Sequence, residues 1–445
     1  MFNALRIFKD RRLLSIFFFG VSSGFPWIMI GSVLSAWLKD EGLSRSSIGL
    51  FGVIFAVYSI NFLWSPLIDR ITPLVLGQRR GWIMSMQLAI TLCCVAMSQL
   101  SAQTSLYFIA LFGLLIALFS STQDIAIDGY RIDVIKAEEK ASMSAASSVA
   151  TAGWWTGYGG LGAIPFFIAD IEGWYWPNIY LLLACIMLGL SLTTLFAKEP
   201  DIDRQALRDA ADTLVFGRNN QAQNTARFSI IPWLKQSLLS PFVEFFSRNG
   251  VKLALSFLLF IFLFKIGEAF LGRMSIVFYK EVGFSNSDIA TYSKLLNWWV
   301  TIIFSLLGGL VNIRYGIYKG LMIAGITMAA SNLMFSLIAH TGPDTSLLAA
   351  AVIIDGFTGA WSTVAMVAFI SLLCNRAFSA TQYALMASLS VAGRTFVASS
   401  SGFVVDALDG NWSLFFVLTA VMVIPSLLFL YSIRHKIGML ERGDI

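Results

Sequence analysis

The feature that most constrains this chain is the recurrence of apolar runs long enough to cross a bilayer, which takes about 20 residues of helix. They follow one another through most of the 445 residues. Charged residues make up only 13% of the chain, about half the share found in soluble proteins. Such a chain cannot solvate its surface in water. We therefore predict an all-α membrane protein.

Twelve segments are predicted to span the membrane. They are residues 13–38, 47–68, 81–101, 104–134, 142–169, 177–197, 250–279, 286–312, 319–340, 346–374, 380–407 and 412–433. The longest polar stretch divides them into two groups of six. We expect a first bundle at residues 1–197, a cytoplasmic linker at 198–248 and a second bundle at 249–445. The later part of the linker, residues 228–246, is predicted to form an interfacial helix.

The distribution of Lys and Arg predicts the orientation. With both termini placed in the cytoplasm, only Lys39, Arg45 and Lys280 lie on external loops. Four further basic residues lie inside predicted spans, so 24 of the 31 face the cytoplasm. This positive-inside bias predicts a multi-pass protein with both termini cytoplasmic. The same bias explains the net charge of +5, and it does not indicate nucleic-acid binding.

Two loops carry related sequences. Ser65-Pro-Leu-Ile-Asp-Arg70 follows the second predicted span, and Gly308-Gly-Leu-Val-Asn-Ile-Arg-Tyr-Gly316 follows the eighth. Asp69 and Asn312 are 243 residues apart, and Gly24 and Gly267 share that spacing. Together with the six-plus-six layout, these matches predict an internal repeat.

The first of these loops, with Arg79-Arg80-Gly81 after it, resembles the loop signature of the major facilitator superfamily. In that superfamily the acid and the arginines of this loop close the cytoplasmic gate. Ser65 stands where the family has glycine, and the loop before Arg79 is longer than in the family. The residues predicted to act in gating are Asp69, Arg70, Arg79, Arg80 and Arg131.

Ionisable side chains inside predicted spans are candidates for function, because a charge at the bilayer centre costs several kcal/mol. Asp124 and Asp128 lie one helical turn apart on the fourth span and share a face. Asp124 is roughly 6 Å from the middle of the span at 1.5 Å per residue. We predict Asp124 as the proton site, with Asp128 and Glu268 also in proton coupling. For Asp128 the alternative is a salt bridge to Arg131 that only holds the helix end.

The second half carries its own set of charges inside spans. The candidates for substrate binding are Lys265, Lys294, Asp355 and Arg394. Lys265 lies three residues before the proton-coupling candidate Glu268, and counting from the span ends puts Glu268, Lys294 and Asp355 at similar depth. They predict a charged lining for a central cavity that binds an anionic substrate and senses protons. The alternative is structural pairing between helices, Lys265 with Glu268 or Lys294 with Asp355.

Aromatic and amide side chains could complete a cavity for a sugar-bearing ligand, because aromatic faces stack on sugar rings and amides bond hydroxyl groups. The predicted set is Tyr58, Asn61, Gln123, Trp154, Trp155, Tyr158, Asn297 and Trp298. For each aromatic residue the alternative is packing or anchoring at the membrane interface.

The sequence shows no nucleophile–base set, phosphate-binding loop or cluster of metal ligands. Its four cysteines lie in apolar runs and are expected to be packing residues. We therefore predict no enzyme activity, no catalytic residues, no metal and no cofactor.

Several strings resemble the AmpG muropeptide permease family across all twelve predicted spans. They include Gly20-Val-Ser-Ser-Gly-Phe-Pro26, Phe62-Leu-Trp-Ser-Pro-Leu-Ile-Asp-Arg70, Ser121-Thr-Gln-Asp-Ile-Ala-Ile-Asp128, Lys265-Ile-Gly-Glu-Ala-Phe270 and Leu373-Cys-Asn-Arg-Ala-Phe-Ser-Ala-Thr-Gln382. The patterns Gln-Asp-Ile-x-x-Asp and Asn-x-x-Phe-Ser-Ala-Thr-Gln are the more specific ones. Eukaryotic acetyl-CoA transporters share part of this sequence, so the resemblance marks a branch of the superfamily before it marks a substrate.

The resemblance implies a major facilitator fold and a place in the bacterial inner membrane. It implies proton-driven symport of N-acetylglucosamine–1,6-anhydro-N-acetylmuramyl peptides into the cytoplasm, which serves peptidoglycan recycling and, in some bacteria, β-lactamase induction and antibiotic resistance. Two alternatives stay open: transport of acetyl-CoA or another anionic metabolite, and a membrane sensor on a transporter fold. Some family members have two further helices, so a shorter paralogue with another substrate is also considered. By analogy with other facilitators we expect a monomer.

Overall fold

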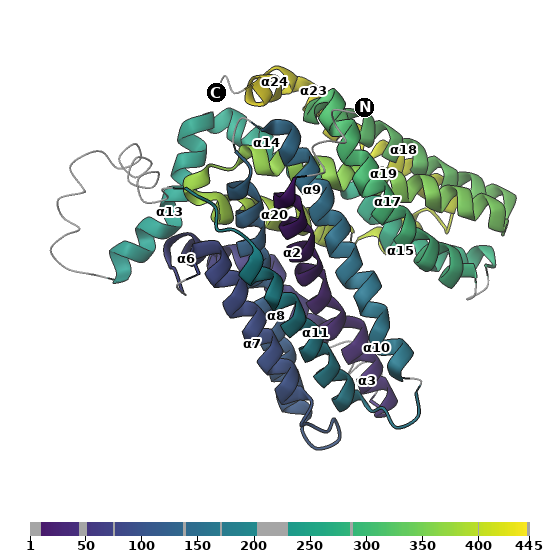
Figure 1. Cartoon of the computed structure of the whole chain (residues 1–445). Helices are drawn as coiled ribbons and strands as arrows, with labels where there is room; N and C mark the ends of the chain where they lie inside the picture. The colour runs from purple at the N-terminus through teal and green to yellow at the C-terminus, as the bar shows by residue number, and fades with distance from the viewer. Residues whose placement is uncertain are drawn as a thin grey trace.

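The computed structural model describes residues 10–43, 51–73, 76–136, 139–169, 171–202, 230–284, 288–398 and 400–442. Within these ranges all regular secondary structure is helical. The helices form two groups that follow the chain, one in purple to teal and one in green to yellow (Figure 1). They meet where α9 packs on α17 and where α20 packs on α8 and α6.

The first half contains six helical runs, three of which change helix type along their length. The runs are α2 Arg11–Ile28 with η1 Met29–Val33 and α3 Leu34–Asp40; η2 Gly52–Ala56 with α5 Val57–Ile60, η3 Asn61–Leu63 and α6 Ser65–Arg70; α7 Gln78–Met97; α8 Leu106–Val134; α9 Lys140–Trp155 with η4 Thr156–Leu161 and α10 Gly162–Ala169; and α11 Trp176–Phe196.

The second half follows the same plan. Its elements are α14 Val251–Leu263 with α15 Ile266–Val282; η6 Ile289–Leu296 with α17 Asn297–Tyr315; α18 Ile317–Thr341; α19 Thr345–Leu373; η7 Arg376–Phe378; α20 Ser379–Ala392 with η8 Gly393–Val397 and α21 Ser401–Ala407; α22 Trp412–Val421 with α23 Ile424–Ser432; and α24 Arg434–Arg442. Before α14, helix α13 spans Ile230–Asn249 and packs on α14, α20 and α6. That α13 lies at a membrane interface stays a prediction.

Nine helices within the described ranges are long and apolar enough to cross a membrane, and each matches a predicted span. The other predicted spans, 47–68, 142–169 and 380–407, coincide with helical runs broken by 3-10 or π-helix. These three runs provide much of the contact between the halves. Small and polar residues are frequent in 142–169 and 380–407, as contacts between membrane helices favour, whereas 47–68 contains the short apolar helix Val53–Leu63. The full number of twelve spans stays a prediction.

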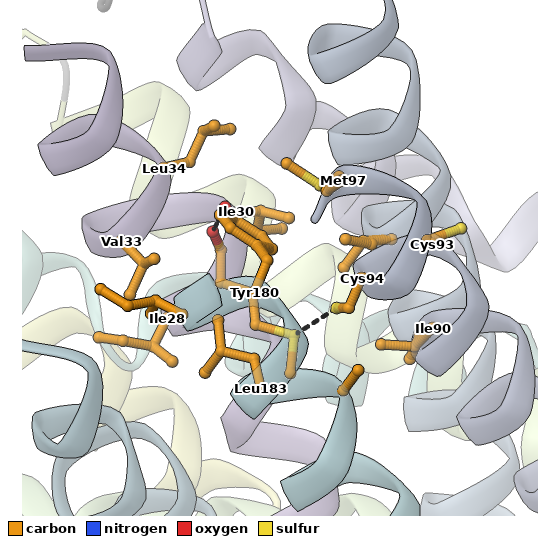
Figure 2. Close-up of a cluster of buried hydrophobic side chains, with 14 of the residues drawn as sticks. Ile28, Ile30, Val33, Leu34, Ile90, Cys93, Cys94, Met97, Tyr180 and Leu183 are labelled. Atoms are coloured by element: carbon orange, nitrogen blue, oxygen red, sulfur yellow. Dashed lines mark hydrogen bonds between the residues drawn. The ribbon is translucent and has the colours of Figure 1, made fainter. Parts of the chain in front are cut away.

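A core of apolar side chains holds the first half together, and part of it is drawn in Figure 2. Ile28 and Val33 pack there beside side chains of α7 and α11. The Tyr180 hydroxyl donates to the carbonyl oxygen of Met29 at 2.8 Å, so the polar group of this buried tyrosine has a hydrogen-bond partner. Since lipid is as apolar as these side chains, the helices gain stability mainly from close packing.

Glycines bring α2 against α9, and this approach shapes the site. A Cβ atom on Gly24 would lie 2.1 Å from the carbonyl oxygen of Trp154, and one on Gly153 would lie 2.3 Å from that of Phe17. Gly267, which shares the 243-residue spacing with Gly24, packs instead on the carbonyl oxygen of Thr419 in α22. These two glycines therefore contact different helices within their halves.

Each half also contains a tryptophan contact that matches one in the other half and was not part of the repeat predicted from the sequence. Trp176 donates its indole N–H to Asp40 at 2.8 Å and ties the start of α11 to the end of α3. Trp412 donates in the same way to Glu281 at 2.7 Å and ties α22 to α15. In each half, a tryptophan at the start of the last run therefore holds the end of the first run, as a repeat requires.

Candidate functional site

A cavity of about 480 Å³ lies between the two halves. It is lined by α2, α8 and α9 of the first half and by α15, α17, α19, α20 and η8 of the second. Nine of the residues predicted from the sequence line it: Asp124, Asp128, Arg131, Trp154, Trp155, Glu268, Asn297, Asp355 and Arg394. Ionisable residues up to 270 positions apart, such as Asp124 and Arg394, therefore face one space.

The first-half wall contains two acids in different surroundings. Asp124 accepts a hydrogen bond from the hydroxyl of Ser23 at 2.7 Å, and no cation pairs with it among the described residues. Asp128 pairs with Arg131 at 3.0 Å, so the salt bridge considered from the sequence is present. Asp128 also lines the cavity, and its part in proton coupling stays a prediction.

Arg131 reaches from the first half into the second. Its guanidinium donates to the hydroxyl of Ser371 at 3.3 Å and lies 4.9 Å from the ring centroid of Tyr383. Its side chain is almost fully buried. Arg131 therefore has an anion on its own helix and two partners on the other half.

The second-half wall contains the other predicted ion pair. The helix breaks between α14 and α15, and Lys265 at this break lies 2.7 Å from Glu268. The same ammonium donates to Thr363 at 2.7 Å and to the carbonyl oxygen of Gly359 at 3.2 Å. Lys265 is therefore buried behind the wall, and Glu268 is the member of the pair that faces the cavity.

The remaining charges of this wall differ in their partners. Asp355 accepts a hydrogen bond from the hydroxyl of Ser331 at 3.0 Å. Arg394 lies on the π-helix η8, is exposed and lines the cavity. Within the described part of the chain, no hydrogen bond or ion pair joins Arg394 to another residue, so its guanidinium is available to a ligand anion. The side chain of Lys294 lies outside the described residues, and its predicted pairing with Asp355 stays untested.

Aromatic rings back the first-half wall behind the two tryptophans that line it. Tyr158 stacks on Trp154 with ring centroids 5.1 Å apart. Trp27 was not among the residues predicted from the sequence. Its ring centroid lies 4.5 Å from that of Tyr58 and 5.9 Å from that of Trp154. Tyr58 and Tyr158 do not line the cavity and instead support the rings that do.

Three more of the predicted binding residues lie outside the cavity lining. Asn61 accepts from the hydroxyl of Ser388 at 3.2 Å, and Trp298 donates its indole N–H to the carbonyl oxygen of Trp155 at 3.2 Å. Both contacts join the two halves. Gln123 is buried and donates to the carbonyl oxygen of Ser22 at 2.8 Å, so it holds α8 against α2.

A network of buried polar residues joins the halves beside the cavity. We call it the latch, and it consists of Asp69, Arg79, Asp133, Ser379 and Thr381. Arg79 contacts Asp69 at 2.7 Å and Asp133 at 2.8 Å, and all three belong to the first half. From the second half, Thr381 donates to Asp69 through its backbone N–H at 2.8 Å and its hydroxyl at 2.6 Å. Ser379 accepts from Arg79 and donates to Asp133, each at 2.8 Å.

The latch uses the electrostatics of a helix end. Asp69 accepts hydrogen bonds at the first turn of α20, where the backbone N–H groups have no partner inside the helix. An anion at this end is favoured by the helix dipole. A carboxylate of one half therefore caps a helix of the other.

Comparison with known proteins places the chain in a family. Residues 16–296 match the Major Facilitator Superfamily. The anhydromuropeptide permease of Escherichia coli strain K12 is 32% identical over 442 residues, which cover 99% of this chain and 83% of that protein. The chain belongs to the Major Facilitator Superfamily, in the family of this permease. Another relative, putative transporter AmpG 4 of Rickettsia conorii, is 32% identical and is covered over 99% of its length.

Solved facilitator structures confirm the predicted fold class. The proton:xylose symporter XylE, bound to 6-bromo-6-deoxy-D-glucose, is similar with a TM-score of 0.65 at 15% identity, over 95% of this chain and 94% of that one. The human organic anion transporter MFSD10 is similar with a TM-score of 0.63 at 16% identity, over 94% and 99%. Identities this low carry information on the fold alone. The family is one of transporters, which agrees with the prediction that the chain is not an enzyme.

In this facilitator, the five residues predicted to act in gating have different positions. Asp69 and Arg79 belong to the latch, and Arg131 lies at the cavity wall two residues before Asp133. Arg80 donates to the carbonyl oxygens of Thr194 and Leu195, at the end of α11, so its contacts stay within the first half. Arg70 is the last residue of α6.

Sequence reasoning missed the second-half side of the latch. Ser379 and Thr381 stand in the string Asn-x-x-Phe-Ser-Ala-Thr-Gln, which was noted for its resemblance but was given no role. Gln382 of the same string donates to Glu244 of α13 at 2.6 Å, and Asn375 donates to that carboxylate at 2.7 Å. An unusual run of small and polar residues at a predicted loop-to-helix boundary was the signal that could have found this contact.

Proposed function

We propose that this facilitator is a proton-driven symporter that imports anhydromuropeptides from the periplasm into the cytoplasm. It would work as a monomer in the bacterial inner membrane with both termini cytoplasmic, and it would serve peptidoglycan recycling and feed β-lactamase induction. The observation that carries the proposal is the cavity in which Asp124 and Arg394 face one space, neither of them in an ion pair with another described residue. The 32% identity to an anhydromuropeptide permease over nearly the whole chain supports the substrate class.

The cavity offers both kinds of contact that such a ligand needs. Anhydromuropeptides carry peptide carboxylates, and Arg394 lines the cavity with no hydrogen bond or ion pair to any described residue. They also carry sugar rings, for which Trp154 and Trp155 present aromatic faces and Asn297 an amide. We assign carboxylate binding to Arg394 and sugar binding to these three residues.

Proton coupling is assigned to the acids of the cavity. A carboxylate in a low-dielectric site without a cation beside it is costly in its charged form, so such a group exchanges a proton readily when its surroundings change. Asp124 has a hydroxyl donor but no cation among the described residues, whereas Asp128 and Glu268 each have a basic partner. Asp124 is therefore the first candidate for the proton site.

The latch is assigned to the cytoplasmic gate. The excess of Lys and Arg on the loops at the latch end supports a cytoplasmic location. In alternating access the two halves rock about a site between them. With the latch formed, substrate would reach the cavity from the opposite side, and opening the latch would release it into the cytoplasm.

The test is uptake of labelled anhydromuropeptide into right-side-out membrane vesicles, with and without an imposed pH gradient. We expect accumulation with the gradient and little without it. The variant Asp124→Asn should lose accumulation but keep ligand binding, and Asp406→Asn, at an exposed position of α21, should behave like the natural protein. Full gradient-driven uptake by Asp124→Asn would overturn the proton role. If the folded protein takes up no anhydromuropeptide, the proposed substrate is wrong.

A further inference from the structure

A second hollow, separate from the central cavity, lies between helices of the second half. It has a volume of about 280 Å³ and runs between α13, α14 and α20. Its walls are apolar and consist mainly of Phe242, Phe245 and Phe246 of α13, Leu258 of α14, and Leu385 and Leu389 of α20. We call this hollow the groove.

The polar groups at the base of the groove already have partners. The hydroxyl of Thr381 donates to Asp69. Gln382 donates to Glu244 at 2.6 Å and to the carbonyl oxygen of Pro241 at 2.9 Å, and its own carbonyl oxygen accepts from the backbone of Asn375 at 2.7 Å. Water in a cavity needs two to four polar partners, so the groove does not suit water.

The groove lies at the depth of the hydrocarbon. Leu258 follows Val251, the first residue of α14, by seven residues, which is about 10 Å along a helix at 1.5 Å per residue. Leu385 and Leu389 lie at similar distances from the start of α20. The apolar core of a bilayer is about 30 Å thick. The groove therefore extends from the first turn of α20, at Thr381 and Gln382, to Leu258 and Leu389 at a depth that acyl chains occupy.

The groove is continuous with the lipid-facing surface of this membrane protein. Leu255 and Leu259 flank Leu258 on α14, with 53% and 44% of their surfaces exposed. A shallower hollow of about 350 Å³ adjoins on the other side of α13, and the two hollows share Phe242 and Phe246. An acyl chain can therefore enter from the bilayer without crossing a polar rim.

We propose that the groove is a binding site for one acyl chain of a membrane phospholipid. A flexible hydrocarbon chain fills a narrow apolar space that neither water nor a rigid side chain of a soluble partner would reach. Thr381 and Gln382 form its base, so the bound chain packs against the start of α20, where the latch forms. The site follows from the placement of the protein in a membrane and does not depend on which substrate it carries.

The test uses the full chain in proteoliposomes of phosphatidylethanolamine and phosphatidylglycerol with a trace of phosphatidylcholine that carries a diazirine in one acyl chain. After irradiation and digestion, mass spectrometry locates the label. We expect peptides around Phe242 and Leu385 to carry several-fold more label than the lipid-facing peptide around Leu192 of α11. Filling the groove by Leu385→Trp should remove this excess, and the matched change Leu192→Trp should not.

Leu389→Phe adds less side-chain volume to the groove than Leu385→Trp. It serves as the test variant if Leu385→Trp does not fold. Folding of each variant is checked by gel filtration and thermal unfolding in detergent. Groove peptides that carry no more label than the Leu192 peptide in the natural chain would overturn the proposal. Unchanged groove labelling in folded Leu385→Trp and Leu389→Phe would also overturn it, because the label would then reflect passing contact with bulk lipid.

Discussion

The latch and the contact between α9 and α17 both join the two halves, but they differ in chemistry. The latch is built from buried charges and hydrogen bonds around Asp69 and Arg79. In the α9–α17 contact, which we call the seam, small residues meet closely, and a hydrogen bond from Trp298 to Trp155 also crosses it. A Cβ atom on Gly309 would lie 1.8 Å from the hydroxyl oxygen of Ser148, which shows how closely the backbone of α17 approaches this side chain of α9.

The difference indicates different roles during transport. Charged groups separated at the latch can be hydrated when that end opens, so the latch can break and form again at moderate cost. A seam of small residues has few directional bonds across it, and the helices can tilt against each other while staying in contact. We infer that the latch is the switch and that the seam is the pivot. The following predictions test this comparison, from the largest expected effect to the smallest.

The largest effect is expected from Arg79→Gln. The change removes the guanidinium that contacts both Asp69 and Asp133, and removing one partner of a buried ion pair costs about 3–5 kcal/mol. The closed latch should open, which can be followed by the alkylation rate of the half-buried Cys374 in a Cys185→Ser background. Arg80→Gln is the matched control, because Arg80 contacts only the first half. Equal rates in both variants would contradict the role of the latch.

A smaller effect on the same contact is expected from Thr381→Val. The change removes the hydroxyl that donates to Asp69 but keeps the backbone N–H that donates to the same carboxylate. A hydrogen bond to a charged group contributes about 1.5–3 kcal/mol. Cys374 should therefore react faster than in the natural protein but more slowly than in Arg79→Gln. In the control Thr327→Val, the lost hydroxyl bonds only to carbonyls of its own helix, and the rate should not change.

The seam is tested by Gly309→Ala. The new Cβ atom would also lie 2.7 Å from the Cβ atom of Ser148, so α9 and α17 must move apart, and overpacking of this kind costs about 1–3 kcal/mol. The thermal unfolding midpoint in detergent should fall and should partly recover in the double variant with Ser148→Gly. Gly189→Ala, where the added atom meets nothing within 4 Å, should leave the midpoint unchanged. If Gly309→Ala also has no effect, the seam does not depend on close approach.

The smallest effect is expected from Glu139→Gln, at an ion pair of the first half that is not part of the latch. Glu139 accepts from Arg12 at 2.6 Å in a partly exposed site, where such pairs contribute less than about 1 kcal/mol. The hydrogen bond from Arg12 lowers the pKa of Glu139. Its contribution should therefore be present at neutral pH and vanish as the pH falls through that lowered pKa. Unfolding midpoints of both proteins at neutral and acidic pH measure this. If Glu139→Gln lowers the unfolding midpoint as much as Arg79→Gln does, the distinction between exposed and buried ion pairs would be contradicted.

Much of the fold could be predicted, because membrane spans are a local property of the chain. The ends of α8, α11 and α19 lie within a few residues of the predicted spans. The spans that the apolar pattern marks least clearly are those at the contact between the halves, where lipid does not dictate the side chains. The candidate site was predicted in part for a related reason: charges are rare in spans, so Asp124 and Arg394 were conspicuous.

The partners of those charges could not be predicted. Lys265 and Arg394 look alike in the sequence, but Lys265 is buried in an ion pair, whereas Arg394 faces the cavity and pairs with none of the described residues. Asp133 and Thr381 are ordinary residues until the two halves bring them together around Asp69 and Arg79.

The sequence by itself determined that this is a helical membrane protein, which charges lie within its spans, and to which family it is similar. Those properties follow from the local cost of placing each residue in lipid. Only the tertiary structure decided that the charges line one cavity, that Asp69 caps α20 and that glycine sets the seam. These contacts join residues up to 312 positions apart, and their existence depends on how the two halves pack, which no local pattern records.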